Sequence, residues 1–318
     1  MKEEISILLS ANEAYARYCA VTMLSILFNT ASVDKICFYI LTPNFSSESI
    51  ERIKELCSRF NAKVSFIPIN LNLFNSFPTF HSHFNQNNYS RICGPDLCEN
   101  CERLVYLDCD LIVLDDIAEL FRHNLNGKPI GAVPHVQLPY EETFIKNFSV
   151  SRNDTYFNSG VMVINADLWR KEKITESVLA LACKYAEKLH FADQDAFNAI
   201  FWENYFHVPG VWNVEARLYR EKLLGLSQTK EITKRIKFPK IIHYTGPNKP
   251  WSSKNYVPKR NLYIEYSERL NSLISWPPDI EIKNFRLPSF TSFIYSCIYF
   301  RTCLYRKKIL QVNLFSKN

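Results

Sequence analysis

The sequence predicts an α/β fold with a Rossmann-like, mixed but mostly parallel sheet flanked by helices, followed by a basic, aromatic C-terminal tail. Short apolar runs, typical of buried strands, alternate with stretches of helical periodicity from the N-terminus onward. The chain has 318 residues, 47% of them hydrophobic, which is enough to bury one large core. The sequence therefore indicates one main catalytic domain with an appendage.

The first 110 residues show a β-α-β order. Apolar strands are predicted at residues 5–10, 35–42 and 63–69, and helices at residues 15–29 and 48–60. Ser46 or Ser47 can cap the second helix, because a serine hydroxyl accepts from a free N–H of the first turn. Alternating strands and helices build a mostly parallel sheet, so we expect a nucleotide-binding half over residues 1 to about 110.

The following segment, residues 111–275, is expected to be the acceptor and sugar half of one catalytic domain, residues 1–275. Further strands are predicted at residues 103–107, 130–133 and 161–164, and a helix at residues 175–189. Trp276, Pro277 and Pro278 block a helix, and the composition changes there. We therefore place the start of the tail, residues 276–318, at this point.

The tail carries all of the excess positive charge. From Lys283 to the end there are seven Lys or Arg and no acidic residue, which leaves 31 basic against 32 acidic residues before it. This asymmetry argues against a nucleic-acid-binding body. Aromatic and basic residues together favour an interfacial helix on an anionic membrane, and residues 290–300 are too few to span one. The alternative is a last helix that packs on the catalytic domain.

The N-terminus and the cysteines indicate a cytoplasmic protein. The apolar run at residues 5–9 is too short for a signal peptide and has acidic flanks. The ten cysteines are spread along a chain too long to need disulfides, so reduced thiols are expected. With the tail, this predicts a protein peripherally associated with the inner face of the plasma membrane.

Asp108 and Asp110 flank Cys109 at the end of a predicted strand, in the run LVYLDCDLIVLDD. Two carboxylates two residues apart in a strand point to opposite faces, so a turn must bring both to one ion. Taken alone this tripeptide is common, and a solvated strand end is the competing interpretation. The apolar flanks on both sides favour a binding site.

A second candidate segment is IIHYTGPNKPW at residues 241–251. A buried strand delivers His243 to a loop, Gly246 permits close approach of the backbone, and Lys249 can meet a phosphate. The alternative is a core histidine with a surface lysine. The density of these residue types favours the functional interpretation.

Two further segments carry polar groups suited to a sugar. In YFNSGV, Asn158 and Ser159 form a small turn before a predicted strand. In FADQD, Asp193 and Gln194 stand at a predicted helix N-terminus, where an acidic residue can also be a stabilising cap. For Asp193 both interpretations remain open.

Together these motifs resemble those of the family 8 glycosyltransferases, in that family's order and approximate spacing, over residues 4 to 265. The resemblance implies a GT-A fold, a UDP-hexose donor, retention of anomeric configuration and a divalent metal, usually manganese. It implies that Asp108, Asp110 and His243 bind the metal. Two carboxylates with one imidazole favour Mn²⁺ over Mg²⁺, which seldom takes nitrogen ligands.

The same resemblance assigns the donor-binding residues. Gly246 and Lys249 resemble the diphosphate loop, and Arg91 resembles the arginine that contacts the donor. Asn158, Asp193 and Gln194 resemble the catalytic residues around the hexose. Cys109, between the two aspartates, and Ser159, next to Asn158, are also expected to contact the UDP-sugar. Because a neutral amide is a poor nucleophile, we expect front-face attack by the acceptor hydroxyl rather than a covalent intermediate at Gln194.

At the nucleotide end the match departs from the family. The segment is SANEAY, with Ala11, Asn12 and Tyr15 at the expected UDP-binding positions. Tyr15 fits the aromatic that stacks on uracil. Asn12 stands where the family has an aspartate, although an amide can pair with uracil as both donor and acceptor.

The sequence thus predicts a retaining hexosyltransferase that moves glucose or galactose from a UDP-sugar to a glycan, such as a lipopolysaccharide core or another surface polysaccharide. One alternative is a self-glycosylating or protein-glycosylating member of the family. Another is a non-catalytic module that binds sugar nucleotides. No residue distinguishes a glucose from a galactose donor.

Overall fold

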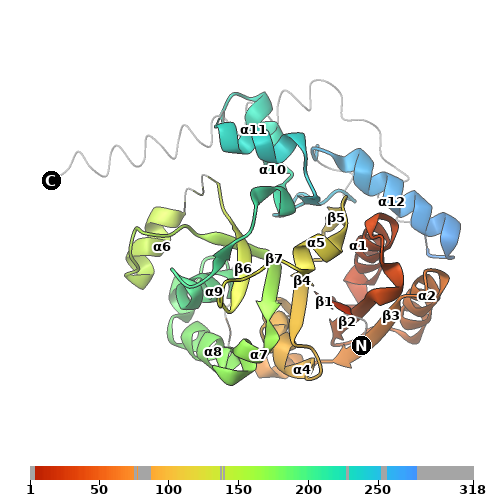
Figure 1. Ribbon diagram of the computed structural model, residues 1–318, viewed down its shortest axis with the longest axis horizontal. Helices are drawn as coiled ribbons and strands as arrows, with labels where there is room; N and C mark the ends of the chain where they lie inside the picture. Colours follow the sequence, from red (N-terminus) through yellow and green to blue (C-terminus); the bar gives the residue numbers. More distant parts are fainter. Residues whose placement is uncertain are drawn as a thin grey trace.

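The fold was analysed in a computed structural model, which describes residues 4–74, 77, 87–136, 138, 140–226, 229–251 and 256–277. The described residues form a seven-stranded sheet and a separate three-stranded sheet, with helices on both faces of the larger one (Figure 1). The predicted tail lies outside the described residues from position 278 onward.

The larger sheet has the strand order β3-β2-β1-β4-β7-β6-β8. Its strands are β1 (Ile5–Ser10), β2 (Ile36–Thr42), β3 (Lys63–Pro68), β4 (Arg103–Leu107), β6 (Ile130–Pro134), β7 (Phe157–Asn165) and β8 (Phe206–His207). Strand β7 runs antiparallel to both of its neighbours, and the other pairs are parallel. The predicted mixed, mostly parallel sheet is confirmed.

The smaller sheet consists of β5 (Leu111–Val113), β10 (Ile241–His243) and β9 (Val214–Glu215), in that order. Strand β10 is antiparallel to β5 and parallel to β9. Its register places His243 opposite Leu111 on one side and opposite Glu215 on the other. This small sheet joins segments of the chain that are more than 100 residues apart.

The α-helices cover both faces of the larger sheet. They are α1 (Ala16–Asn29), α2 (Ser47–Arg59), α3 (Asn87–Ser90), α4 (Gly94–Leu97), α5 (Ile117–Phe121), α6 (Glu141–Phe148), α7 (Ala166–Lys171), α8 (Ile174–Lys184), α9 (Asp193–Phe201), α10 (Arg217–Leu223), α11 (Lys230–Lys237) and α12 (Arg260–Leu273). Short 3₁₀ helices are η1 (Glu13–Tyr15), η2 (Val33–Lys35), η3 (Leu71–Phe74), η4 (Arg91–Cys93), η5 (Ala186–Lys188) and η6 (Gly210–Trp212).

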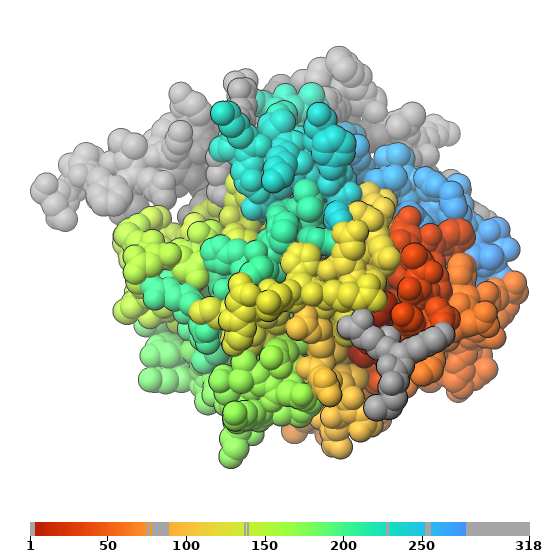
Figure 2. Space-filling view, in the orientation of Figure 1, coloured from red at the N-terminus to blue at the C-terminus, as the bar shows by residue number. Residues whose placement is uncertain are grey.

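Strand β1 shows why the core forms on both faces. Its alternate residues Ile5, Ile7 and Leu9 join the apolar cluster beneath α1, α2, α5 and α12, whereas Leu8 joins the cluster beneath α4, α7, α8 and α9. Side chains alternate between the two faces of a strand, so a continuous apolar run is buried on both. In the space-filling view, α1 in red and α12 in blue lie side by side (Figure 2).

Local signals located the first elements well. Strand β1 has the predicted bounds, and the Ser46 hydroxyl accepts a hydrogen bond from the Ser49 amide at the start of α2, so the cap is Ser46 rather than Ser47. The predicted helix over residues 175–189 is shorter, because α8 ends at Lys184 and a 3₁₀ turn follows. Within the described ranges, no helix combines the length and apolarity needed to cross a bilayer.

The predicted turn at Asn158 and Ser159 is wrong, because both residues lie inside β7. The register between β6 and β7 shifts between Ala132 and Val133, which is where β7 passes the end of β4. Such an irregularity re-aims side chains at a sheet edge. The strand therefore carries Asn158 past the carboxyl end of β4, toward the segment that contains Asp108.

Candidate active site

A cavity of about 370 Å³ opens beyond the carboxyl ends of β1 and β4. In open α/β sheets, ligands bind outside the carboxyl ends of the strands, where the strand order reverses. The cavity is lined by eleven of the residues predicted from the sequence: Asn12, Tyr15, Arg91, Asp108, Cys109, Asp110, Asn158, Gln194, His243, Gly246 and Lys249.

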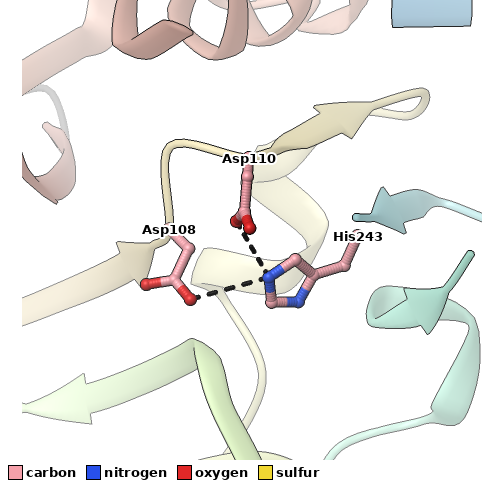
Figure 3. A group of neighbouring side chains, drawn as sticks. All are labelled: Asp108, Asp110 and His243. Atoms are coloured by element: carbon pink, nitrogen blue, oxygen red, sulfur yellow. Dashed lines mark hydrogen bonds and ion pairs between the residues drawn. The ribbon is translucent and has the colours of Figure 1, made fainter. Parts of the chain in front are cut away.

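The turn between β4 and β5 brings Asp108 and Asp110 to the same side, as the sequence required (Figure 3). His243, the last residue of β10, points between them: its Nε2 lies 3.0 Å from Asp110 Oδ1 and 3.5 Å from Asp108 Oδ2. Among the described residues, these three form the one group of His, Cys, Asp and Glu side chains that could hold a metal ion.

The backbone locks this arrangement. The Tyr244 amide donates to the Asp110 carbonyl at 2.9 Å, and the Asp108 amide donates to the Gly160 carbonyl at 2.9 Å. A side chain at Gly160 would overlap both the His243 ring and the Asp108 carboxylate. A glycine at this position of β7 is therefore needed for the two side chains to approach each other.

Two amides orient the His243 ring. Asn213 Nδ2 donates to Asn158 Oδ1 at 2.8 Å, so Asn213 Oδ1 faces His243 Nδ1 at 2.9 Å. Asn213 Oδ1 therefore accepts a hydrogen bond from Nδ1–H, without transfer of the proton, and Nε2 is directed at the two carboxylates. Metal-binding histidines commonly donate their other ring N–H to a fixed acceptor in this way. The donor set of two hard oxygens and one imidazole nitrogen fits a borderline divalent ion.

Charge compensates charge throughout this cluster. Burial alone would raise the pKa of Asp110, but Lys249 and His243 hold that pKa well below its usual range. Burial would lower the pKa of His243, and Asp110 and Asp108 instead raise it to about 9. The two carboxylates therefore stabilise the charged, imidazolium form of His243.

Arg91 and Lys249 supply the fixed positive charges. Arg91, on η4, donates from Nη1 to Asp108 Oδ1 at 2.9 Å and from Nε to Asp193. Lys249 contacts Asp110 Oδ2 and donates to the Tyr244 carbonyl at 3.0 Å. Each cation therefore already has a carboxylate partner, and each lines the cavity where an anionic ligand can reach it.

Gln194 is held by a network of neutral groups. Its Oε1 accepts from the Ser159 amide at 3.0 Å and from Asn158 Nδ2 at 3.2 Å, and its Nε2 donates to the Tyr156 hydroxyl at 3.2 Å. Tyr156 in turn donates to Asp195. Burial raises the pKa of Asp195 to about 6, although four hydrogen-bond donors favour its charged form. Gln194 is thus fixed at the base of the cavity.

The nucleotide end is built by η1 and the loop after β10. The exposed Tyr15 ring meets Trp251 edge-on at 5.8 Å between centroids, and Tyr18 stacks on Trp251 at 3.7 Å. The buried Oδ1 of Asn12 has no hydrogen-bond partner among the described residues. An orphaned buried acceptor that lines a cavity calls for a donor from a ligand.

Three residues predicted for the site do not line the cavity themselves. Ala11, Ser159 and Asp193 are buried, and the last two are fully so. Asp193 is the first residue of α9, and its side chain accepts a hydrogen bond from Arg91 Nε. The carbonyl of Ser159 lies 3.3 Å from Arg91 Nη1, so both residues support the site from behind.

Sequence reasoning missed eight residues that line the cavity: Ser10, Tyr106, His135, Leu138, Phe191, Glu215, Arg217 and Thr245. Four of them adjoin a recognised motif in the chain. Ser10 precedes Ala11, Tyr106 precedes the Asp108 turn, Phe191 precedes Asp193 and Thr245 precedes Gly246. His135, Leu138, Glu215 and Arg217 have no comparable signal in the sequence.

Comparisons with known proteins agree on one family. The model of glycosyl transferase family 8 matches residues 6–255. The chain is 30% identical over 275 residues to general stress protein A of Bacillus subtilis (strain 168), covering 83% of this chain and 94% of that protein. It is 25% identical over 246 residues to lipopolysaccharide 1,2-glucosyltransferase of Escherichia coli (strain K12), covering 76% and 71%.

Solved structures show the same fold. The galactosyltransferase LgtC, solved in complex with donor and acceptor sugar analogues, superimposes with a TM-score of 0.76 at 22% identity, covering 86% of this chain and 98% of that one. At this identity the likeness establishes the GT-A fold. The family match, which spans most of the chain, shows that the protein belongs to glycosyltransferase family 8.

Proposed function

We propose that this protein is a retaining hexosyltransferase that moves glucose or galactose from a UDP-sugar to a glycan acceptor. The observation that carries the proposal is the cluster of Asp108, Asp110 and His243 beside Lys249 in the cavity. Buried opposite charges add little to stability, because desolvation offsets their attraction. A site for a divalent ion and a diphosphate explains why they are gathered there.

Asp108, Asp110 and His243 would hold the metal, for which Mn²⁺ suits the donor set best. The ion would act as a Lewis acid that neutralises charge on the departing diphosphate. Asp108 is restricted to one coordinating oxygen, because its Oδ1 accepts from Tyr106 at 2.7 Å and from Arg91 at 2.9 Å. Its Oδ2 faces His243.

Lys249 would stabilise the leaving group. Its ammonium contacts Asp110 and lies in the same loop as Gly246, whose left-handed backbone (φ +80°) has open space around it. A lysine on this loop can turn from Asp110 to a diphosphate oxygen, and preorganised positive charge at developing negative charge is a large source of catalysis. Arg91, tied to Asp193, would fix the donor at the opposite side of Asp108.

Front-face attack by the acceptor hydroxyl follows from the state of Gln194. The amide is neutral, and its Oε1 already accepts from Asn158 and Ser159, so it is poorly placed to become a nucleophile. The leaving phosphate would take the proton of the acceptor hydroxyl. Asn158 and Gln194 would orient the hexose and support the developing positive charge with their dipoles.

UDP recognition would use Asn12 and Tyr15. The orphaned Oδ1 of Asn12 can accept the N3–H of uracil while its Nδ2 donates to a uracil carbonyl, and Tyr15 offers an aromatic face. An asparagine in place of the family's aspartate keeps the acceptor for N3–H and adds a donor, without a charge.

We propose an acceptor and a cellular location as well. A relative at 25% identity is named a lipopolysaccharide 1,2-glucosyltransferase, which supports a lipopolysaccharide core or another surface polysaccharide as acceptor. We also propose that the protein is cytoplasmic and that its basic, aromatic tail binds the inner face of the plasma membrane. Deletion after Asp279 should then release it from anionic vesicles and leave donor hydrolysis intact.

The test of the function is release of UDP or GDP from UDP-glucose, UDP-galactose, UDP-N-acetylglucosamine and GDP-mannose, each with Mn²⁺ and with EDTA. We expect metal-dependent release from one UDP-hexose, and NMR of the product formed with an acceptor should show the donor's anomeric configuration. Release that is unchanged by EDTA, or turnover of GDP-mannose alone, would contradict the proposal.

A further inference from the structure

Residues 217–240 concentrate positive charge on an otherwise acidic body. They include eight Lys or Arg and two Glu, a net charge of +6, which leaves 23 of the 31 basic and 30 of the 32 acidic residues before Lys283 for the rest of the body. The two helices of this segment, α10 and α11, lie at the periphery of the described chain, at the top of the view (Figure 1). The Tyr219 hydroxyl donates to the Ile236 carbonyl at 3.1 Å and Lys222 donates to Thr233, so the helices pack as an antiparallel hairpin.

Three lysines form a stripe along α11. Lys230, Lys234 and Lys237 are exposed and stand at positions i, i+4 and i+7, which share one face of a helix. Ile232 and Ile236 lie on the opposite face and pack against the apolar core. The lysine stripe therefore faces away from the body.

The lysine stripe lacks acidic partners. The two glutamates of the segment are engaged by arginines, since Glu221 pairs with Arg217 and Glu231 pairs with Arg235, each at 2.8 Å. Within the described ranges, none of the three lysines forms an ion pair. Helix stability does not explain the stripe, because Lys230 is the first residue of α11, where the helix dipole disfavours a cation. The charge of the stripe is thus available to a partner.

Exposed apolar side chains flank the lysine stripe. Leu223, the last residue of α10, is 65% exposed, and Phe238, directly after α11, is 67% exposed. Lys237 Nζ lies 5.0 Å from the centre of the Phe238 ring, so charge and apolar surface adjoin there. Leu223 follows Lys222, which reaches α11 through Thr233. Lysines beside exposed large apolar residues are typical of a surface that lies on an anionic bilayer.

We propose that the hairpin surface, which consists of Leu223, Lys230, Lys234, Lys237 and Phe238, binds an anionic phospholipid bilayer. The lysines meet the lipid phosphates, and the two apolar side chains enter the boundary between headgroups and acyl chains. A nucleic acid would neutralise the lysines and leave Leu223 and Phe238 in water, so the composition favours the bilayer.

The hairpin surface is separate from the C-terminal tail and adds a second membrane contact. One interfacial signal gives marginal, reversible binding, and two linked signals reinforce each other, so the loss of either should release the protein. Helix α10 begins at Arg217, which lines the cavity. Contact through the hairpin surface would therefore also fix how the cavity faces the bilayer.

The test is co-sedimentation of the full chain with vesicles of phosphatidylcholine, with and without phosphatidylglycerol. The triple variant Lys230→Gln, Lys234→Gln and Lys237→Gln should bind the anionic vesicles about 10²-fold more weakly. The control triple Lys171→Gln, Lys173→Gln and Lys184→Gln changes the net charge equally, at exposed positions of the α7–α8 region, and should stay within about threefold. Wild-type binding by the first triple, or equal losses in both, overturns the proposal.

A second variant separates a bilayer from a soluble polyanion. Leu223→Ser with Phe238→Ser keeps every charge and should weaken vesicle binding by about tenfold. Leu73→Ser is the control, because Leu73 is also 65% exposed but lies in η3, and it should bind like the wild type. Unchanged vesicle binding by the double variant, or wild-type binding to single-stranded RNA as tight as to anionic vesicles, would refute the bilayer as partner. An unchanged Tm shows that each variant is folded.

These measurements need no turnover, and every variant keeps the tail, so the hypotheses fail separately. Release on deletion after Asp279, with wild-type binding by the lysine triple, would leave the tail as the membrane contact and refute the hairpin surface. A protein that binds vesicles as expected but turns over no sugar nucleotide refutes the proposed function alone.

Discussion

Two groups of charged residues meet at the cavity and differ in their partners. The Asp110 cluster, which consists of Asp108, Asp110, His243 and Lys249, faces the cavity, where a ligand can reach it. In the Arg217 network, which consists of Arg217, Glu215 and Glu221, the charged groups are paired with one another. Asp110 contacts the imidazole of His243 and the ammonium of Lys249, and all three residues line the cavity. Arg217 instead donates to Glu215, Glu221 and two neighbours with every N–H it has.

The pKa values show the same contrast. Burial would raise the pKa of Glu215, but Arg217 lowers it to about 2, so this carboxylate is a permanent charge. The carboxylates of Asp110 and Asp108, in contrast, raise the pKa of His243 to about 9. An arrangement whose protons and partners exchange suits binding and chemistry, and a closed one suits selection by shape and charge. We therefore expect single substitutions in the Asp110 cluster to reduce activity, and substitutions in the Arg217 network to change specificity.

The sharpest way to break this comparison is Asp110→Asn. The variant removes a proposed metal ligand and the partner of Lys249, so we expect metal-dependent UDP release to fall by about 10³-fold or more. Release assays with saturating Mn²⁺, combined with titration of Mn²⁺ binding, measure it. Asp115→Asn is the matched control, because Asp115 does not line the cavity and pairs with Lys240, 3.0 Å away. Wild-type metal affinity in Asp110→Asn would contradict the metal assignment.

Lys249→Ala should have the next largest effect. Loss of the ammonium leaves Asp110 with one cationic partner and the leaving diphosphate without its lysine, and we expect kcat to fall by about 10²-fold. Steady-state kinetics with Mn²⁺ held at saturation measure this change. In the control Lys240→Ala, a lysine that pairs with Asp115 and Glu119 is lost, and activity should stay within about twofold. An unaffected kcat in Lys249→Ala would show that this lysine is structural.

Gly160→Ala should weaken the site by crowding it. The added methyl group would overlap the His243 ring and the Asp108 carboxylate, so we expect Mn²⁺ affinity to fall by about tenfold. Calorimetric titration measures it. Gly127→Ala is the control, because Gly127 has φ +77° and nothing near its missing side chain. That change should cost about 1 kcal/mol of stability without altering the affinity. A Gly160→Ala protein with unchanged affinity would exclude the close packing described here.

Asp195 is a buried carboxylate with no cation partner among the described residues, so its pKa should make the stability depend on pH. Its pKa is about 6 in the folded protein against an ordinary 3.8, so the folded state binds the proton more tightly. The resulting stability is complete below pH 3.8 and is lost as the pH rises through 6. Between pH 4 and 7, the free energy of unfolding should fall by about 2 kcal/mol more in the wild type than in Asp195→Asn. Urea unfolding at each pH measures the difference, and parallel curves for the two proteins would refute it.

Much of the Asp110 cluster could be predicted from the sequence. Strand β1, helix α2 and strand β4 follow from apolar runs and a serine cap, which act over a few residues. Asp108 and Asp110 stand close together in the chain at the end of an apolar strand, so their convergence needed only a turn. Lys249 and Gly246 follow His243 within one loop. The family and the GT-A fold were predicted from these local motifs and confirmed.

The Arg217 network and the orientation of the His243 and Asn158 side chains depend on tertiary structure. His243 reaches Asp110 because β10 pairs with β5, and Asn213 orients the ring from another segment. Asn158 was expected in a turn, yet the pairing of β7 with β4 and β6 places it inside a strand.

The sequence by itself therefore determined the order of strands and helices, the apolar core and the residue types of the metal site, because each depends on neighbours in the chain. Only the tertiary structure decided which charges meet. Glu215 and Glu221 are close to Arg217 in the chain, but His135 and Val136, which also contact it, lie in a loop about 80 residues earlier. Such contacts form through sheet pairing and packing between distant segments, and no local pattern records them.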